Sequence, residues 1–156
     1  MHGLLLSLDL SRTNRGGITQ NLWGWICHDV HAVLAQELKI RAKVQAELIL
    51  KKRKINHLPI LEIGCGSGIL LNQLAKNGKE VYGIEISQKM LEIARIRLAR
   101  YGQSDNLSSQ SAEEALSAYN FVDFDFVLIH TLEHILEPRR LLQNIVKNMT
   151  SDSSLF

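Results

Sequence analysis

Cysteine, proline and long apolar runs are all scarce in this sequence. Its 156 residues include two cysteines, Cys27 and Cys65, which stand far apart and lack the spacing of metal ligands. This scarcity argues against a disulfide scaffold and a metal centre and favours a reducing compartment, so we expect a cytoplasmic protein. The apolar segment at residues 4–6 is too short for a signal peptide, and no later run approaches membrane-spanning length. We therefore expect neither secretion nor insertion into a membrane.

Neither sign of charge dominates the chain. Eighteen lysines and arginines balance sixteen aspartates and glutamates, which leaves a net charge of +2. The densest basic run, Lys51-Lys52-Arg53-Lys54, ends a predicted helix, where cations complement the negative end of the helix dipole. Because this run is short and has no interleaved aromatic residues, it indicates a solvated helix end rather than a nucleic-acid site. The expected partner is a small molecule.

Three alternating glycines mark the centre of the chain. A short apolar run containing Glu62 is followed by Gly64, Gly66 and Gly68 and then by an apolar pattern with helical spacing. This order predicts a strand, a tight loop and a helix, the opening of a ligand-binding α/β unit. Glu62 is unusual inside a buried strand, so we expect a ligand to give it a polar or cationic partner.

A carboxylate follows the next predicted strand, at residues 80–85. In a βαβ unit Glu85 lies beside the glycine loop, where it can accept hydrogen bonds from both hydroxyls of a ribose. Enzymes that bind NAD share this arrangement, but their glycine fingerprint requires a glycine where this chain has Ile69. An NAD-linked oxidoreductase is therefore the weaker alternative.

The remaining patterns predict an α/β fold, a Rossmann-like parallel sheet with helices on both faces. An amphipathic helix is expected over about 22–50, and further helices follow Gly68, Ser87, Ser111 and Pro138. Residues 107–110 form a weak third strand, residues 121–129 lead into an apolar fourth strand, and residues 155–156 begin a fifth. We divide the chain into an N-terminal loop and helical segment at 1–54 and a partial ligand-binding domain at 55–156.

Three motifs resemble those of one enzyme family. The segment Glu62-Ile-Gly64-Cys-Gly66-Ser-Gly68 resembles motif I of the class I S-adenosylmethionine-dependent methyltransferases, and Glu85 stands where that family holds the cofactor ribose. The segment Leu132-Glu133-His134, ahead of a helix that begins with proline, is similar to the region after the fourth strand in small-molecule methyltransferases. Dehydrogenases lack this third motif. The resemblance covers residues 58–155 and implies S-adenosylmethionine as the cofactor.

The resemblance also implies site residues. Those expected to bind the cofactor are Glu62, Gly64, Cys65, Gly66, Glu85, Ile86, Ala112, Glu113 and His130. The family often has an aspartate where this chain has Ser111, so Glu113 is the candidate substitute in contacting adenine. His134 is the candidate general base if the acceptor is a phenol, enol or amine, and its alternative role is to fix the turn before a helix. No metal is expected.

The resemblance stops short of a complete fold. The family's sheet has seven strands, and here the last three are absent or barely begun, so we infer a truncated chain, an early-terminated product or a domain that another chain completes. Each case leaves the fourth strand as an apolar edge that favours self-association. The predicted function is methyl transfer to a small-molecule acceptor, and a catalytically inactive methyltransferase-like interaction module is the main alternative.

Overall fold

The computed structural model describes the backbone of residues 19–53 and 57–156, with side chains from residue 34 onward. Helix α1 spans Thr19–Lys52 as one continuous helix. The chain divides into two compact units, Met1–Gln36 and Glu37–Phe156, and all that follows concerns the second. The predicted N-terminal loop at residues 1–18 lies outside the described residues.

A four-stranded sheet forms the centre of the second unit. Its strands are β1 (Ile60–Ile63), β2 (Val81–Ile84), β3 (Leu107–Ser108) and β4 (Asp125–Val127). They pair in the order β3-β2-β1-β4, and every pairing is parallel. The helices are α2 (Ile69–Lys76), α3 (Gln88–Ala99), α4 (Ala112–Ala118), the 3-10 turn η1 (Leu132–His134) and α5 (Pro138–Asn148). The predicted Rossmann-like parallel fold is confirmed.

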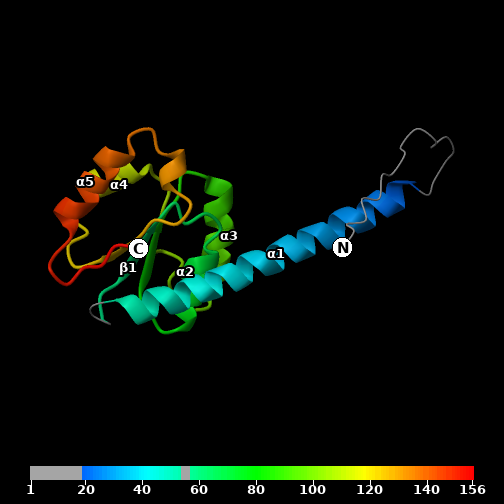
Figure 1. Cartoon of the computed structure of the whole chain (residues 1–156), viewed down its shortest axis with the longest axis horizontal. Helices are drawn as coiled ribbons and strands as arrows, with labels where there is room; N and C mark the ends of the chain where they lie inside the picture. The colour runs from blue at the N-terminus through cyan, green and yellow to red at the C-terminus, as the bar shows by residue number, and fades with distance from the viewer. Residues whose placement is uncertain (1–18, 54–56) are drawn as a thin grey trace, which may run out of the picture. The chain divides into compact units, whose positions relative to one another are not determined.

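Alternate residues of the strands build two separate cores. Ile60 and Val127 pack on one face of the sheet with α2, α3 and the last three turns of α1. Leu61 and Phe126 pack on the other face with α4 and α5. Figure 1 shows α4 and α5 together on one side of β1, apart from α2 and α3. A strand covered on both faces must be apolar throughout, which explains why β1 carries only one polar residue.

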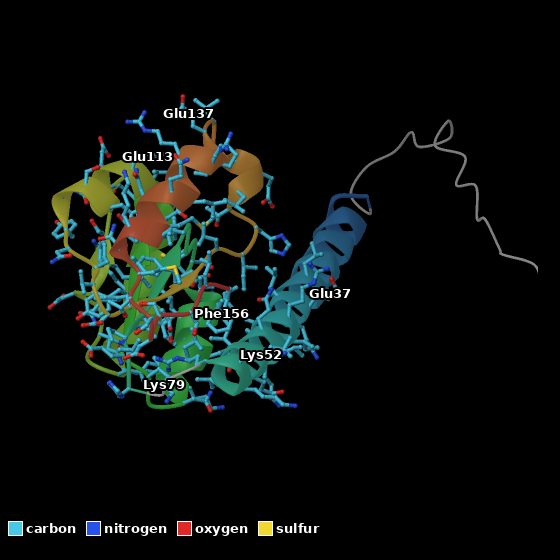
Figure 2. The ribbon with its side chains drawn as sticks, turned by 60° about the vertical axis from the view of Figure 1, so that its left-hand side comes forward. Glu37, Lys52, Lys79, Glu113, Glu137 and Phe156 are labelled. Atoms are coloured by element: carbon cyan, nitrogen blue, oxygen red, sulfur yellow. The ribbon has the colours of Figure 1, made fainter. Side chains whose placement is uncertain are left out.

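All strands point toward the same edge of the sheet. Lys52 and Lys79 precede β1 and β2, whereas Glu113 and Glu137 follow β3 and β4 at the beginnings of α4 and α5. In Figure 2 the two lysines lie at one end of the unit and the two glutamates at the other. The glutamates mark the carboxyl edge of the sheet, where ligands bind in open α/β folds.

The predicted helix starts are confirmed. The Met90 N–H donates to Ser87 Oγ at 3.4 Å. Ser111 and Glu114 form a reciprocal capping box, in which the Glu114 N–H donates to Ser111 Oγ at 3.2 Å and the Ser111 N–H to Glu114 Oε2 at 3.0 Å. Pro138 occupies the first turn of α5, where its missing N–H has no partner to lose. These local signals determine the residue at which each of these helices begins.

The buried face of α1 differs from the one predicted. The helix contacts the core through Ala42, Ala46 and Ile49. Larger apolar residues of this part of the helix are about half exposed instead: Leu38, Val44 and Leu48. Small side chains allow a helix to approach a neighbouring layer closely, and a count of large apolar residues misses such a face. The prediction of a helix holds, but its apolar residues do not gather on one buried face.

The basic run at the end of α1 is only partly solvated. Lys51 and Lys52 are exposed as predicted, but Arg53 is buried and forms an ion pair with Asp125 in which neither side chain is exposed. The other oxygen of Asp125 accepts a hydrogen bond from the Ser154 N–H at 2.7 Å. One buried carboxylate thus ties together the end of α1, β4 and the C-terminal segment.

Strand β4 is shorter than the predicted segment 121–129. Asp123 has a φ of 63°, which turns the chain just before the strand begins. Phe124 packs edge-to-face on Tyr82 and Phe121, with ring centroids 5.1 and 5.4 Å apart. The aromatic residues that suggested a longer strand therefore cover one face of the sheet instead.

The outer edge of β4 is paired, contrary to the expectation of an open apolar edge. The Phe126 N–H donates to the Ser154 carbonyl at 2.9 Å, and the Phe156 N–H donates to the Phe126 carbonyl at 3.0 Å. Leu155 forms a parallel bridge with Phe126, which agrees with the predicted start of a fifth strand. The last residues of the chain, rather than β4, therefore form this edge of the sheet.

Candidate functional site

Two cavities lie at the carboxyl edge of the sheet. The first, which we call the β2-side cavity, has a volume of about 270 Å³ and includes six of the predicted site residues: Gly64, Glu85, Ile86, Ala112, His130 and His134. The second, the α1-side cavity, has a volume of about 200 Å³ and includes Glu62, Gly64, Cys65 and His130. Eight of the ten predicted residues thus line two adjoining hollows, and Gly64 and His130 line both, whereas Gly66 and Glu113 line neither.

The glycine loop crosses from the end of β1 to the end of β2. The N–H groups of Gly64 and Cys65 both donate to the Ile84 carbonyl, at 2.8 and 3.0 Å. Gly64 has a φ of 76°, and a Cβ there would lie 2.6 Å from Thr131 Oγ1. A side chain at this position would meet both backbone strain and a clash, so the loop requires glycine where it faces the cavities.

The Glu85 carboxylate is bonded to the glycine loop. Its Oε2 accepts from the Gly66 N–H at 2.9 Å, and its Oε1 accepts from the Ser87 N–H at 2.8 Å. Each carboxylate oxygen has a second lone pair, so Glu85 can accept further hydrogen bonds. The predicted proximity of Glu85 to the loop is present in the structure.

Glu62 is a buried carboxyl group of the site whose hydrogen-bonding capacity is only partly used. Its side chain is 5% exposed, and among the described residues its Oε2 has no hydrogen-bond partner. Burial and, secondarily, the neighbouring Glu85 charge raise the pKa of Glu62 to about 8, while the Leu71 backbone N–H acts in the opposite direction. A group with this pKa is mostly protonated at neutral pH and ionises when a cation arrives.

Cys65 contributes its backbone to the loop and its side chain to the core. The residue is 6% exposed, and a Cβ on Gly83 would lie 2.7 Å from its Sγ. Burial, with the nearby Glu62 and Glu85 charges adding to it, raises the pKa of the Cys65 thiol. A neutral, packed thiol is not a nucleophile, so Cys65 serves the site by filling space beneath the loop.

The α4 side of the β2-side cavity is largely apolar. Ile86 is 74% exposed and lines the cavity together with Ala112, the first residue of α4. Gln110 also lines this cavity, although no motif singled it out. Its only sequence signal was a polar side chain directly after a strand. Glu113 lines neither cavity.

The segment after β4 forms the opposite wall. Thr131 is buried, and its Oγ1 donates to the Ile63 carbonyl at 2.8 Å, which ties the segment to β1. His130 has a φ of 56°, and its Nδ1 lies 3.6 Å from Glu133 Oε1. The His134 N–H donates to the Thr131 carbonyl at 3.0 Å, so the predicted turn-fixing role involves its backbone. Sequence reasoning missed Thr131.

The strand order, the glycine loop and the acidic residue after β2 are those of a Rossmann-like nucleotide-binding fold. Residues 61–155 match the family model described as "Methyltransferase domain", and the chain belongs to this family. Among the described residues, no helix is both long enough and apolar enough to cross a membrane.

The curated relatives carry one recurrent name. A ubiquinone biosynthesis O-methyltransferase of Colwellia psychrerythraea is 32% identical over 117 residues, which are 74% of this chain and 47% of that protein. An enzyme of the same name from Aromatoleum aromaticum is 41% identical over 80 residues, 51% of this chain and 34% of that protein. The chain thus spans between a third and a half of the length of these relatives.

Solved structures support the fold. An S-adenosylmethionine-dependent methyltransferase from Clostridium acetobutylicum has a TM-score of 0.64 at 20% identity and aligns with 83% of this chain and 56% of its own. The [4+2]-cyclase SpnF has a TM-score of 0.60 at 20% identity and aligns with 69% of this chain and 41% of its own. At these identities the likeness extends to the fold alone.

Proposed function

We propose that this chain binds S-adenosylmethionine and forms the donor half of a site for methyl transfer to a small molecule. The observation that carries the proposal is the pair of adjoining cavities, with Glu85 in one and Glu62 in the other. A ligand with a sugar at one end and an amino-acid group bearing an ammonium at the other fits this arrangement. The relatives named as O-methyltransferases favour an oxygen atom as the acceptor.

The nucleoside end is assigned to the β2-side cavity. Glu85 would accept hydrogen bonds from the ribose hydroxyls through the lone pairs that Gly66 and Ser87 do not use. Ile86 and Ala112 would pack on the two faces of the adenine ring, since both offer apolar surface there. The role predicted for Glu113 stays a prediction.

The amino-acid end is assigned to the α1-side cavity. Glu62 is buried there with an unbonded oxygen, and a positively charged ammonium group would supply the missing partner. Arg41 of α1 lines the same cavity and offers a guanidinium to the carboxylate of the ligand. Opposite charges on the protein would thus match the two charges of the zwitterionic end.

S-adenosylmethionine would supply an electrophilic methyl group on a sulfonium, so the protein needs few reactive groups. The chain's part is to hold the donor in a fixed orientation and to exclude water from one side of it. The buried wall formed by Thr131 and Ile63 and the tight turn at Gly64 suit this task. A cytoplasmic location is part of the proposal, supported by the scarcity of cysteine.

The Glu85→Ala variant is expected to lose S-adenosylhomocysteine binding by about 100-fold or more. The substitution removes the acceptors of two charge-assisted hydrogen bonds, each worth about 1.5–3 kcal/mol, and releases Gly66. Isothermal titration calorimetry measures the change. Glu92→Ala, an exposed carboxylate on α3, is the matched control and should bind as the unaltered chain does. Equal affinity in both variants would refute the proposed ribose contact.

Self-association through the sheet edge also belongs to the proposal. Among the described residues Leu155 pairs with Phe126 on one side and with no strand on the other, and an exposed strand edge offers hydrogen bonds to a further strand. The supporting observation is that Leu155 is 41% exposed. Sedimentation velocity should show a mass that rises with concentration, and a monomeric mass at every concentration would contradict this.

A methyltransferase-like module without activity is the second candidate. The similarity to a cyclase indicates that this fold accommodates other chemistry. Binding of S-adenosylhomocysteine without methyl transfer to any acceptor would favour this candidate. Detectable transfer would exclude it.

A further inference from the structure

His130 lies where the two cavities meet. It lines the β2-side cavity together with Glu85 and the α1-side cavity together with Glu62. If the sugar and amino-acid ends of the donor occupy these cavities, as proposed above, His130 would be the side chain nearest to the part of the donor that links the two ends. The other residue common to both cavities is Gly64, which has no side chain.

The His130 ring faces a carboxylate on one of its two nitrogens. Its Nδ1 lies 3.6 Å from Glu133 Oε1, and both side chains are more than half exposed. The backbone of His130 has a φ of 56°, an uncommon conformation for a residue with a side chain. A carboxylate at Nδ1 favours the tautomer with a proton on that nitrogen and leaves Nε2 free to accept one.

We infer that His130 is the general base that deprotonates a phenolic acceptor during methyl transfer, an assignment that rests on the proposed function. As the acceptor oxygen forms its bond to the methyl carbon, its proton moves to His130 Nε2. The bond from carbon to sulfur breaks, and its electron pair stays on sulfur as a neutral thioether. Glu133 stabilises the imidazolium through Nδ1, and the proton then leaves to water.

Phenols suit this base better than other hydroxyl compounds do. A phenolic hydroxyl ionises near pH 10 and an imidazole near neutrality, so proton transfer in the transition state is efficient, whereas an aliphatic alcohol is too weak an acid.

The test uses the His130→Gly variant with catechol as the acceptor and S-adenosylmethionine as the donor. Glycine adopts a φ of 56° without strain, so the backbone should keep its course. We expect the rate of S-adenosylhomocysteine formation to fall by about 10²–10⁴-fold. The affinity of the variant for S-adenosylhomocysteine should equal that of the unaltered chain. Added imidazole should restore part of the rate, which a purely structural role would not allow.

Three further results would overturn the assignment. The first is a full rate in His130→Gly, and the second is a comparable loss in His134→Gln with no rescue of His130→Gly by imidazole. The third is an unaltered chain that binds S-adenosylhomocysteine but forms none from catechol. Failure to bind S-adenosylhomocysteine at all would refute the proposed function instead. His57→Gln, an exposed histidine outside both cavities, serves as the control for loss of any imidazole group.

Discussion

Replacing Arg53 by alanine is expected to lower the free energy of unfolding by about 3–5 kcal/mol, the range for breaking a buried ion pair. The loss is large because Asp125 would remain buried as an uncompensated charge, with neither side chain of the pair exposed to water. Asp125 also holds the Ser154 N–H, so its misplacement would loosen the C-terminal strand pairing. Urea denaturation followed by far-UV circular dichroism measures the change.

Matched variants separate the ion pair from its surroundings. Lys52→Ala removes an exposed cation one position away and should change the free energy of unfolding by no more than about 0.5 kcal/mol. Asp125→Asn keeps the size of the side chain and removes its charge, and it should be nearly as damaging as Arg53→Ala. The double variant should lose less than the sum of the two. If the free energy of unfolding fell by less than about 1 kcal/mol in both single variants, the ion pair would not be what stabilises this part of the fold.

Binding of S-adenosylmethionine is expected to strengthen steeply between pH 6 and pH 8. Glu62 has a pKa of about 8 in the empty site, and a ligand ammonium requires its ionised form. Each binding event at lower pH must therefore release a proton, so the affinity should rise by up to about 10-fold per pH unit and level off above pH 8. Calorimetry in buffers of different ionisation enthalpy should detect close to one proton released at pH 6.5.

The Glu62→Gln variant and a truncated ligand test the source of this dependence. Glutamine cannot ionise, so proton release should vanish and the affinity should fall at every pH. 5′-Methylthioadenosine lacks the ammonium group, and its binding should release no proton from Glu62. Proton release with this ligand equal to that seen with S-adenosylmethionine would contradict the assignment of Glu62 to the amino-acid end.

Glu62 also makes the stability of the empty protein depend on pH, and in the direction opposite to that of the ligand affinity. Its folded pKa of about 8 exceeds the ordinary value of 4.5, so the folded chain holds a proton that the unfolded chain has released between these values. The contribution to stability is complete below pH 4.5 and is lost as the pH rises toward 8. The empty protein should thus weaken over the range in which its ligand affinity grows, and Glu62→Gln should not show this loss.

Local sequence signals predicted the parts of the fold that depend on neighbouring residues. Ser87, Ser111 and Pro138 each begin a helix through contacts within a few positions, so their roles are legible from the sequence. Glu85 was placed correctly beside the loop because a βαβ unit leaves little choice about where the end of its second strand lies.

Long-range packing was not predictable in the same way. Arg53 looked like one of four solvated cations, because its partner lies 72 residues later on a strand whose register was unknown. The contact face of α1 was misjudged because alanines, rather than the larger apolar residues, meet the core. The roles of Gln110 and Thr131 depend on which loop residues turn inward, and periodicity carries no such information.

The hydrogen bond from Gly66 to Glu85 affects the rate of ligand association and the entropy lost on binding. The loop is already fastened in the empty protein, and Ile84 holds its first two N–H groups. A nucleoside arriving at this edge therefore finds a rigid receptor, and little conformational entropy is lost as the complex forms. Association should be limited by diffusion and orientation rather than by folding of the loop.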